Sequence, residues 1–330
     1  MIIIVNEMVR DPKRRKLFGE SARQFHAAFS RCLWPGNKCK APAIRAHSIQ
    51  NRVVLDALCD NGHVVMPRMQ VSIDAPPSIR FQRVGRKDAS TFTGLCGRHD
   101  QMLFGPVEKQ QLRITDSQHA FLLAYRAALK ENHASLKAGI DVQSTYLRGG
   151  NAGLWSRDEP SAAGIMAVQK MVAAFFVDQV AVEFGKSYLL GCWDRVRHQI
   201  LTLDVGATIA ANSMFSTGLE SRFGDGAAFV CLNVLPYEGR TVAMFSFLSD
   251  DESPAEAAFG HIWTASGHYR QYLLSKLILA KCENLVIAPK LFDTFSNEQS
   301  EAIRAYYESS TYDDSYERDD ARLYLFAPVH

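Results

Sequence analysis

The sequence predicts an α+β fold made of two modules, and three observations lead to it. The chain has 330 residues, more than twice the roughly 150 of an average domain. Turn signals such as Pro35-Gly36 divide residues 32–104 into short pieces, whereas long helical and strand-like runs follow residue 115. We therefore expect a small module in residues 1–115 and a larger module of helices and an antiparallel sheet in residues 116–330.

In the first module, a helix is expected over residues 11–31, where Phe18 and Phe29 belong to an apolar stripe behind a basic start. Brief strand-like runs follow at residues 43–49 and 63–66. So much loop with so little continuous core needs a further stabilising element. In a small module that element is often a bound metal ion.

In the second module, Thr115 or Asp116 begins a helix expected over residues 116–137, which would connect the two modules. A longer helix over residues 160–184 is apolar nearly all round, and we expect it to be buried in the core. Three strands are expected at residues 198–204, 227–235 and 241–248, and a short strand at residues 284–288. Helices are expected over residues 253–282 and 296–309.

The composition is that of an ordinary globular protein, with 47% hydrophobic and 22% charged residues, which excludes collagen, coiled-coil and mucin-like chains. The most apolar segment is interrupted by Lys170, Asp178 and Glu183, so no run reaches the ~18 apolar residues of a membrane span. Residues 1–5 are too short for a secretory signal, and seven cysteines do not indicate a disulfide framework. We expect a cytoplasmic protein with no membrane partner.

The strongest chemical signal in the first module is a set of four sulfur and nitrogen ligands. Cys32 and Cys39 flank the Pro-Gly turn, and Cys96 and His99 are separated by two residues at the start of an expected helix. Zinc takes four such ligands at tetrahedral positions, so these residues predict a structural Cys3His zinc site.

Two alternatives to this zinc site stay open. Cys32 and Cys39 have six residues between them, more than the usual two to four, and both could instead be apolar side chains of a compact loop. Cys59 and His63 are spaced like a ligand pair and could replace one member of the set.

The order of these residues resembles the HNH nucleases of the zinc-stabilised, treble-clef or ββα-metal type. The resemblance rests on the cysteine pair, on Ala46-His47-Ser48-Ile49 and on Gly94-Leu95-Cys96 with His99-Asp100, and it covers roughly a quarter of the chain.

The resemblance implies that His47 is a general base and that Asp100 binds a catalytic Mg²⁺ or Mn²⁺ ion. Ala46 stands where the family usually has a metal-binding side chain, and His99 stands where it usually has a fourth Cys. Glu108 is the candidate for the missing catalytic ligand. Such architectures suit bacterial defence or mobile-element biology.

Charge is divided unevenly along the chain. Residues 1–115 hold 19 Lys or Arg and 9 Asp or Glu, whereas the remainder holds 18 and 26. Excess positive charge favours phosphate binding through counterion release, although it also suits a solvated surface or a contact between the modules. We expect nucleic acid to contact the cations of the first module, in particular Arg45, Arg52, Arg83, Arg86, Lys87 and Arg98.

These observations predict a cytoplasmic zinc-binding protein that contacts nucleic acid and cleaves it with a divalent metal. The second module would regulate or target it, with a protein partner or a second copy of the chain as its ligand. The alternative is a non-catalytic binding protein whose zinc only stabilises the fold, and Ala46 favours that alternative.

Overall fold

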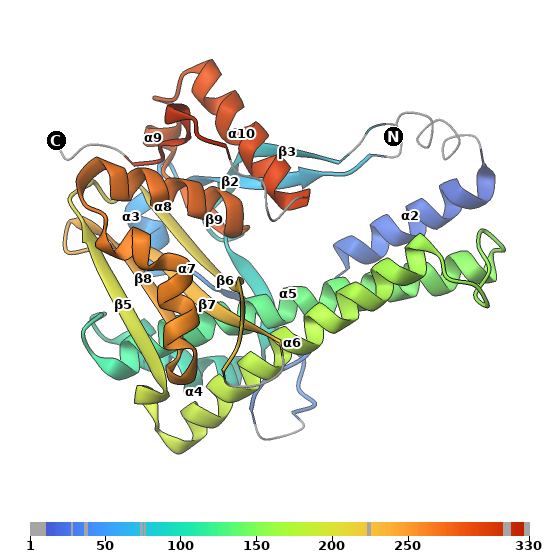
Figure 1. The fold of residues 1–330 in the computed structure, drawn as a ribbon, viewed down its shortest axis with the longest axis horizontal. Coiled ribbons are helices and arrows are strands. Elements are labelled where there is room, and N and C mark those ends of the chain that lie inside the picture. The colour runs from blue at the N-terminus through green and yellow to red at the C-terminus, as the bar shows by residue number, and fades with distance from the viewer. Residues whose placement is uncertain are drawn as a thin grey trace.

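The computed structural model describes residues 11–27, 29–35, 39–72, 75, 77–222, 226–312 and 318–326. Over these residues the chain forms two antiparallel sheets and a set of covering helices (Figure 1). The predicted α+β class is confirmed.

The larger sheet has seven strands, all antiparallel to their neighbours. In spatial order they are β3 (Ser78–Gly85), β2 (His63–Gln70), β9 (Leu285–Ile287), β6 (Ile209–Glu220), β7 (Ala227–Tyr237), β8 (Arg240–Leu248) and β5 (Val196–Leu203). Ile287 of β9 pairs with Val65 on one side and with Ile209 on the other. The sheet therefore takes strands from both sides of residue 115, and β9 joins them.

The central strands are apolar on both faces because helices contact both. Strands β6 and β7 contact α5 (Ser117–Asn151) as well as α7 (Glu252–Thr264), and β6 also contacts α8 (Gly267–Lys281). In β8 every residue from Thr241 to Leu248 is buried. Of these seven strands, the sequence predicted β2, β5, β7, β8 and β9. It did not predict β3 or β6.

The smaller sheet pairs β1 (Ile44–His47) with β4 (Thr91–Leu95), and α4 (Gly97–Lys109) follows at once. Between the two strands the chain forms a π turn (Asn51–Leu55), the short α3 (Asp56–Leu58) and the β2–β3 hairpin. The treble-clef or ββα-metal likeness of this region stays a prediction.

Helices α5 and α6 (Ala162–Leu190) form a long hairpin that extends beyond the sheet (Figure 1). Asp116 caps α5 by accepting from the backbone N–H groups of Gln118 and His119, and Ser161 caps α6. The helix predicted to end at residue 137 continues to Asn151 because α6 and α2 (Pro12–His26) pack against its second half.

The prediction that residues 160–184 form a buried helix is right about the helix and wrong about its burial. Only one stripe of α6, which includes Ala174, Val177 and Phe184, is buried, whereas Val168 and Phe175 are 63% and 58% exposed. The physical reason is that the outer half of the hairpin lies beyond the sheet, so α6 has one helix as its neighbour there.

By length and composition α6 could cross a membrane, and no other helix in the described part of the chain passes that test. One such helix is weak evidence for a membrane protein. The cytoplasmic location stays a prediction.

Two further helix predictions needed correction. The expected helix over residues 253–282 is two helices, α7 and α8, because Ala265 and Ser266 adopt extended backbone angles and end the first. The expected helix over residues 11–31 ends earlier, as α2 (Pro12–His26). The fold is completed by α9 (Pro289–Phe292) and α10 (Asn297–Tyr312), the second of which the sequence predicted.

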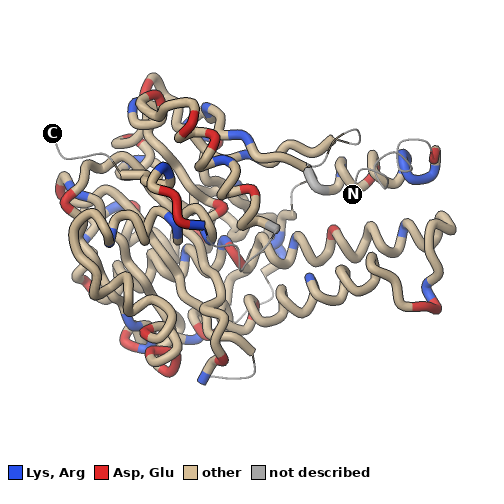
Figure 2. The backbone as a smooth tube through the Cα atoms, turned by 45° about the horizontal axis from the view of Figure 1, so that its top comes forward, with Lys and Arg blue, Asp and Glu red and all other residues tan. Residues whose placement is uncertain are grey.

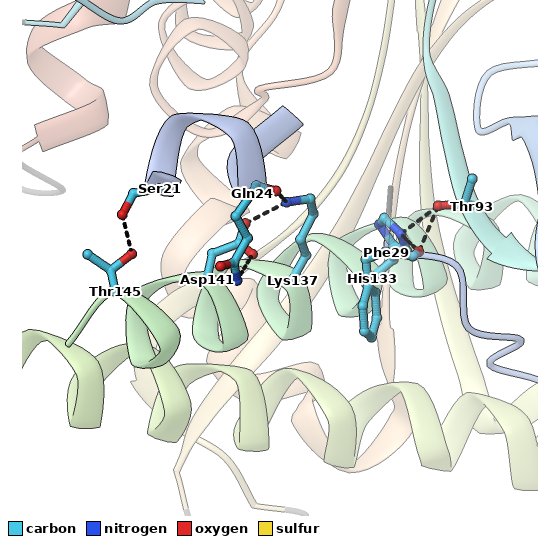
Figure 3. A network of polar contacts seen from close by, with 8 residues as sticks. All are labelled: Ser21, Gln24, Phe29, Thr93, His133, Lys137, Asp141 and Thr145. Atoms are coloured by element: carbon cyan, nitrogen blue, oxygen red, sulfur yellow. Dashed lines mark hydrogen bonds and ion pairs between the residues drawn. The ribbon is translucent and has the colours of Figure 1, made fainter. Parts of the chain in front are cut away.

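Helix α2 is attached to the second half of α5 by a small polar network (Figure 3). Ser21 Oγ lies 2.9 Å from Thr145 Oγ1, and Gln24 Nε2 donates to Asp141 Oδ1 over 2.9 Å. Lys137 Nζ donates to the Gln24 carbonyl and to Asp141 Oδ2, so one lysine joins the two helices.

Candidate metal centre

The structure brings together the four side chains that the sequence singled out as metal ligands. Their sulfur and nitrogen atoms all lie within 4.8 Å of one another. Cys39 Sγ is 3.9 Å from Cys96 Sγ. Cys32 Sγ is 3.3 Å from His99 Nδ1.

Local structure explains how segments so far apart in the sequence meet. Leu33 N donates to the Gly94 carbonyl over 2.8 Å. This hydrogen bond fixes residues 29–35, called the Cys32 loop below, beside β4. Cys96 is the residue before α4 and His99 lies in its first turn, so the two side chains can face the same side of the helix start. The Trp34 ring stacks on the His99 imidazole at 4.3 Å between centroids and holds its orientation.

The spacing of these atoms fits a metal ion. A tetrahedral zinc ion with Zn–S near 2.3 Å and Zn–N near 2.0–2.1 Å keeps its ligand atoms roughly 3.5–3.8 Å apart. The two distances above lie close to that range. The Cys3His cluster can therefore hold a metal ion such as zinc.

The pKa values of the ligands are shifted in different directions. Burial raises the pKa of the Cys32 thiol to about 11. Burial also acts to raise the pKa of Cys96, but hydrogen bonds with the His99 backbone N–H, the Cys32 and Cys39 thiols and the Arg98 backbone N–H outweigh it and leave this pKa below its usual value. Burial and the Arg98 charge lower the pKa of His99, which favours the neutral imidazole that binds metal.

Cys59 and His63, the alternative ligand pair suggested by the sequence, are not part of the cluster. Cys59 Sγ donates to the Asp56 carbonyl, and His63 Nδ1 lies 2.9 Å from the Asn61 carbonyl in the turn before β2. These contacts give both side chains partners within their own turns.

His47 lies at the end of β1, opposite Thr91 of β4. Its Nε2 is 3.2 Å from the Arg86 carbonyl, which can only accept, so the neutral ring carries its proton on Nε2. Nδ1 is then the unprotonated nitrogen. Burial lowers the pKa of His47, although the Arg86 carbonyl opposes this, and the ring is neutral at pH 7.

Asp100 occupies the first turn of α4 and shares an electrostatic environment with His47. Burial raises the pKa of Asp100, Arg126 acts to lower it and Glu108 adds to the rise. Arg126 and Glu108 also act on the pKa of His47. The four side chains are therefore close enough to influence one another.

The sequence analysis missed Arg126. Its side chain is only 3% exposed, pairs with Glu108 Oε1 at 2.6 Å and lies 4.0 Å above the centre of the Phe104 ring. An arginine within the apolar run of residues 120–129 was the available signal, because arginine is seldom fully buried without a partner.

The described residues around His47 and Asp100 do not form a second group of metal ligands. Among the residues that the structure describes, the Cys3His cluster is the only set of three or more His, Cys, Asp or Glu atoms close enough to share an ion. Ala46 pairs with Phe92 and offers no ligand. Any catalytic ion would therefore depend on fewer protein ligands than the resemblance implies.

Three of the six predicted nucleic-acid contacts pair with carboxylates of the protein itself. Arg45 contacts Asp88 at 2.6 Å, Arg83 contacts Asp293 at 2.7 Å, and Arg86 contacts Asp56. The backbone view shows Lys and Arg interspersed with Asp and Glu over much of the molecule (Figure 2).

The other three predicted contacts are exposed and have no carboxylate partner in the described part of the chain: Arg52, Lys87 and Arg98. Exposed ion pairs contribute at most about 1 kcal/mol, so phosphate groups can also compete for the paired arginines. Residues 1–115 thus include exposed cations both with and without a carboxylate partner.

A scan against protein-family models, a search of curated proteins and a search of solved structures each found no match for this chain.

Proposed function

We propose that this protein is a zinc-stabilised, HNH-like endonuclease that binds nucleic acid through its basic N-terminal region. The observation that carries the proposal is the geometry of His47. Its Nε2 is held at the Arg86 carbonyl while burial keeps the ring neutral, which leaves Nδ1 ready to accept a proton.

In the proposed reaction, His47 Nδ1 accepts a proton from water as the water oxygen forms a bond to a backbone phosphorus. The phosphorus–oxygen bond to the departing nucleotide breaks, and the leaving oxygen takes a proton from solvent. Asp100 and Glu108 are the side chains that would hold Mg²⁺ or Mn²⁺, which when bound would stabilise negative charge on the phosphate. Zinc at the Cys3His cluster has a separate role and holds α4 beside the Cys32 loop.

In this proposal the protein binds nucleic acid by electrostatic contact with phosphates, and it does not distinguish one base sequence from another. Arg52, Lys87 and Arg98 are the exposed cations that would meet phosphates. Reversing all three charges to Glu should weaken plasmid binding and reduce its dependence on salt. The matched control reverses three exposed cations outside residues 1–115, Lys170→Glu, Arg197→Glu and Lys290→Glu, in one chain.

The cleavage test incubates the purified full-length protein with supercoiled plasmid and Mg²⁺ or Mn²⁺. We expect the wild type to nick the plasmid and His47→Ala to be about a hundredfold slower or worse. His261→Ala, at an exposed position of α7, should cut like the wild type. Plasmid that is bound by the wild type yet stays intact with both metals would overturn the cleavage step.

A second candidate function is binding of nucleic acid without cleavage, and two observations favour it. Ala46 provides no ligand, and the buried Arg126 already supplies a positive charge near Asp100 and Glu108. In that case zinc serves the fold alone, and the plasmid is retarded in a gel without being cut.

A further inference from the structure

Helix α6 has two distinct faces, and in the described part of the chain only one of them packs against another helix. The face toward α5 carries small residues at seven-residue intervals, Ala167, Ala174 and Ala181, all of them buried. Close approach is needed there, since a Cβ added to Gly139 of α5 would lie 3.0 Å from Met171 Sδ. This face is fully used by the hairpin.

The opposite face of α6 is exposed, and toward its C-terminal end Val182, Lys186 and Leu189 also line a cavity beside Cys32 and Pro35. Its side chains recur at alternating intervals of three and four residues, the spacing of a coiled-coil seam. Gln179 and Lys186 occupy two of these positions. The apolar positions are all exposed: Ile165, Val168, Val172, Phe175, Val182 and Leu189.

We propose that this seam is the interface of a homodimer, in which α6 packs against α6 of a second copy of the chain. The three-and-four spacing fits another helix. A helix that lies on a lipid surface has its apolar face bordered by many cations, whereas Lys170 and Lys186 are the cations of α6.

The other helix of the hairpin argues against a bilayer as the partner. Over the outer part of the hairpin, α6 is joined to a stretch of α5 that carries Lys137, Asp141 and Arg148 and is itself covered by α2. A bilayer could not receive α6 without those charges, whereas a protein partner meets only the exposed seam.

The exposed seam is large enough for a specific dimer. Burial of an apolar side chain removes roughly 60–120 Å² from water, so six on each copy give roughly 700–1,400 Å². This range includes the ~1,000 Å² above which contacts between proteins are usually specific. Met166, Met171 and Leu190 are also exposed at the borders of the seam and would add to it.

Charge favours an antiparallel arrangement of the two helices. Lys186 Nζ pairs with Glu183 of its own helix, and a parallel pair would place two of these ion pairs in the same layer, where removing their charges from water is costly. An antiparallel pair centred on residue 177 places Val172 opposite Val182 of the second copy. The Lys186 stem then lies over Val168, and its ammonium group reaches solvent.

The experiment measures the mass of the full-length protein by sedimentation from low to high micromolar concentration. We expect the wild type to be a dimer. Val172→Glu or Phe175→Glu should weaken dimerisation about a hundredfold or more, because each dimer would bury two unpaired carboxylates. Tyr269→Glu places the same charge at a 63% exposed apolar residue of α8 and should leave the dimer intact.

A wild type that is monomeric throughout this range would overturn the proposal, as would a seam variant that dimerises like the wild type. Sedimentation with phosphatidylcholine vesicles tests the bilayer directly, and a monomer that binds them through α6 would also overturn it. Far-UV circular dichroism of each variant confirms that α6 is intact, so that a loss of dimer is not a loss of fold.

The orientation is tested by mixing a Val172→Cys chain with a differently tagged Val182→Cys chain. Antiparallel packing predicts a disulfide between the two tagged species. A disulfide that joins two Val172→Cys chains instead would overturn the antiparallel arrangement. The proposal does not depend on nuclease activity, so its outcome is independent of the plasmid assay.

Discussion

Two regions of this molecule differ sharply in what holds them together. Between Phe29 and Pro42, Cys32 is the only described side chain that is buried, whereas every side chain from Thr241 to Leu248 of β8 is buried. The first region depends on a few directed contacts around the Cys3His cluster. The second depends on apolar area removed from water on both faces of a sheet. Four predictions test this contrast, from the largest expected effect to the smallest.

Replacing one ligand of the cluster should have the largest effect. We expect Cys96→Ser to lose the bound metal and to expose the segments around Cys32 and Cys39 to protease, because a structural zinc ion can contribute about 10 kcal/mol or more to the fold that it holds. Elemental analysis and limited proteolysis measure the two changes. Cys192→Ser is the control, since that thiol lies outside the cluster. Unchanged metal content would show that Cys96 is not a ligand.

A cavity in the sheet core should destabilise the protein without touching the metal. Phe245 is fully buried and its ring packs against those of Phe259 and Trp263. Phe245→Ala should lower the free energy of unfolding in urea by about 3–5 kcal/mol while the metal content stays at the wild-type level. Tyr269→Ala, at an exposed position, should cost less than about 0.5 kcal/mol. Loss of metal from Phe245→Ala would mean that the two regions unfold together.

Acid should weaken the sheet region through His198. Burial lowers the pKa of His198 to about 4, and its Nδ1 lies 2.8 Å from Ser246 Oγ. The unfolded chain, with an ordinary histidine pKa near 6.5, binds this proton first as the pH falls. Stability contributed by the neutral ring is present above pH 6.5 and is lost between pH 6.5 and 4, by about 3 kcal/mol in total.

Urea unfolding at pH 7 and at pH 4 measures this loss. His198→Gln cannot take up the proton and should lose about 3 kcal/mol less than the wild type over the same interval. An identical pH dependence in the two proteins would show that His198 is not the group responsible.

The smallest effect is expected where α2 meets α5, a contact made by polar groups (Figure 3). Gln24→Ala removes the hydrogen bond to Asp141 Oδ1 and should cost about 1 kcal/mol or less. Hydrogen exchange of the α2 amides should speed up while exchange in β7 and β8 stays unchanged. The exposed Arg23→Ala is the control. Faster exchange in the sheet would contradict the local character of this contact.

Sequence reasoning succeeded where the signal is local. The Cys96 and His99 spacing, the Asp116 cap and the strands at residues 227–235 and 241–248 each depend on a few neighbouring residues, and the structure contains all of them. It failed for β6. Residues 209–215 are mostly apolar but do not alternate with polar residues, so their pattern fits a short buried helix as well as a strand.

The burial of α6 and the position of Arg126 show a second kind of failure. An apolar helix is expected in a core, yet the outer face of α6 is largely exposed to solvent. Arg126 was overlooked because nothing in its local sequence identifies Glu108 as its partner. Both outcomes depend on which segments meet in space.

The sequence by itself determined the helices and strands whose caps and periodicity are local, the basic character of the first 115 residues and the four residues able to bind one metal ion. Only the tertiary structure decided that β9 joins the β2–β3 hairpin to the strands after residue 196, and that one face of α6 stays open to solvent. The physical reason is that backbone preferences and ligand chemistry belong to single residues and short segments. Burial and strand pairing depend on neighbours that the chain supplies from far along its length.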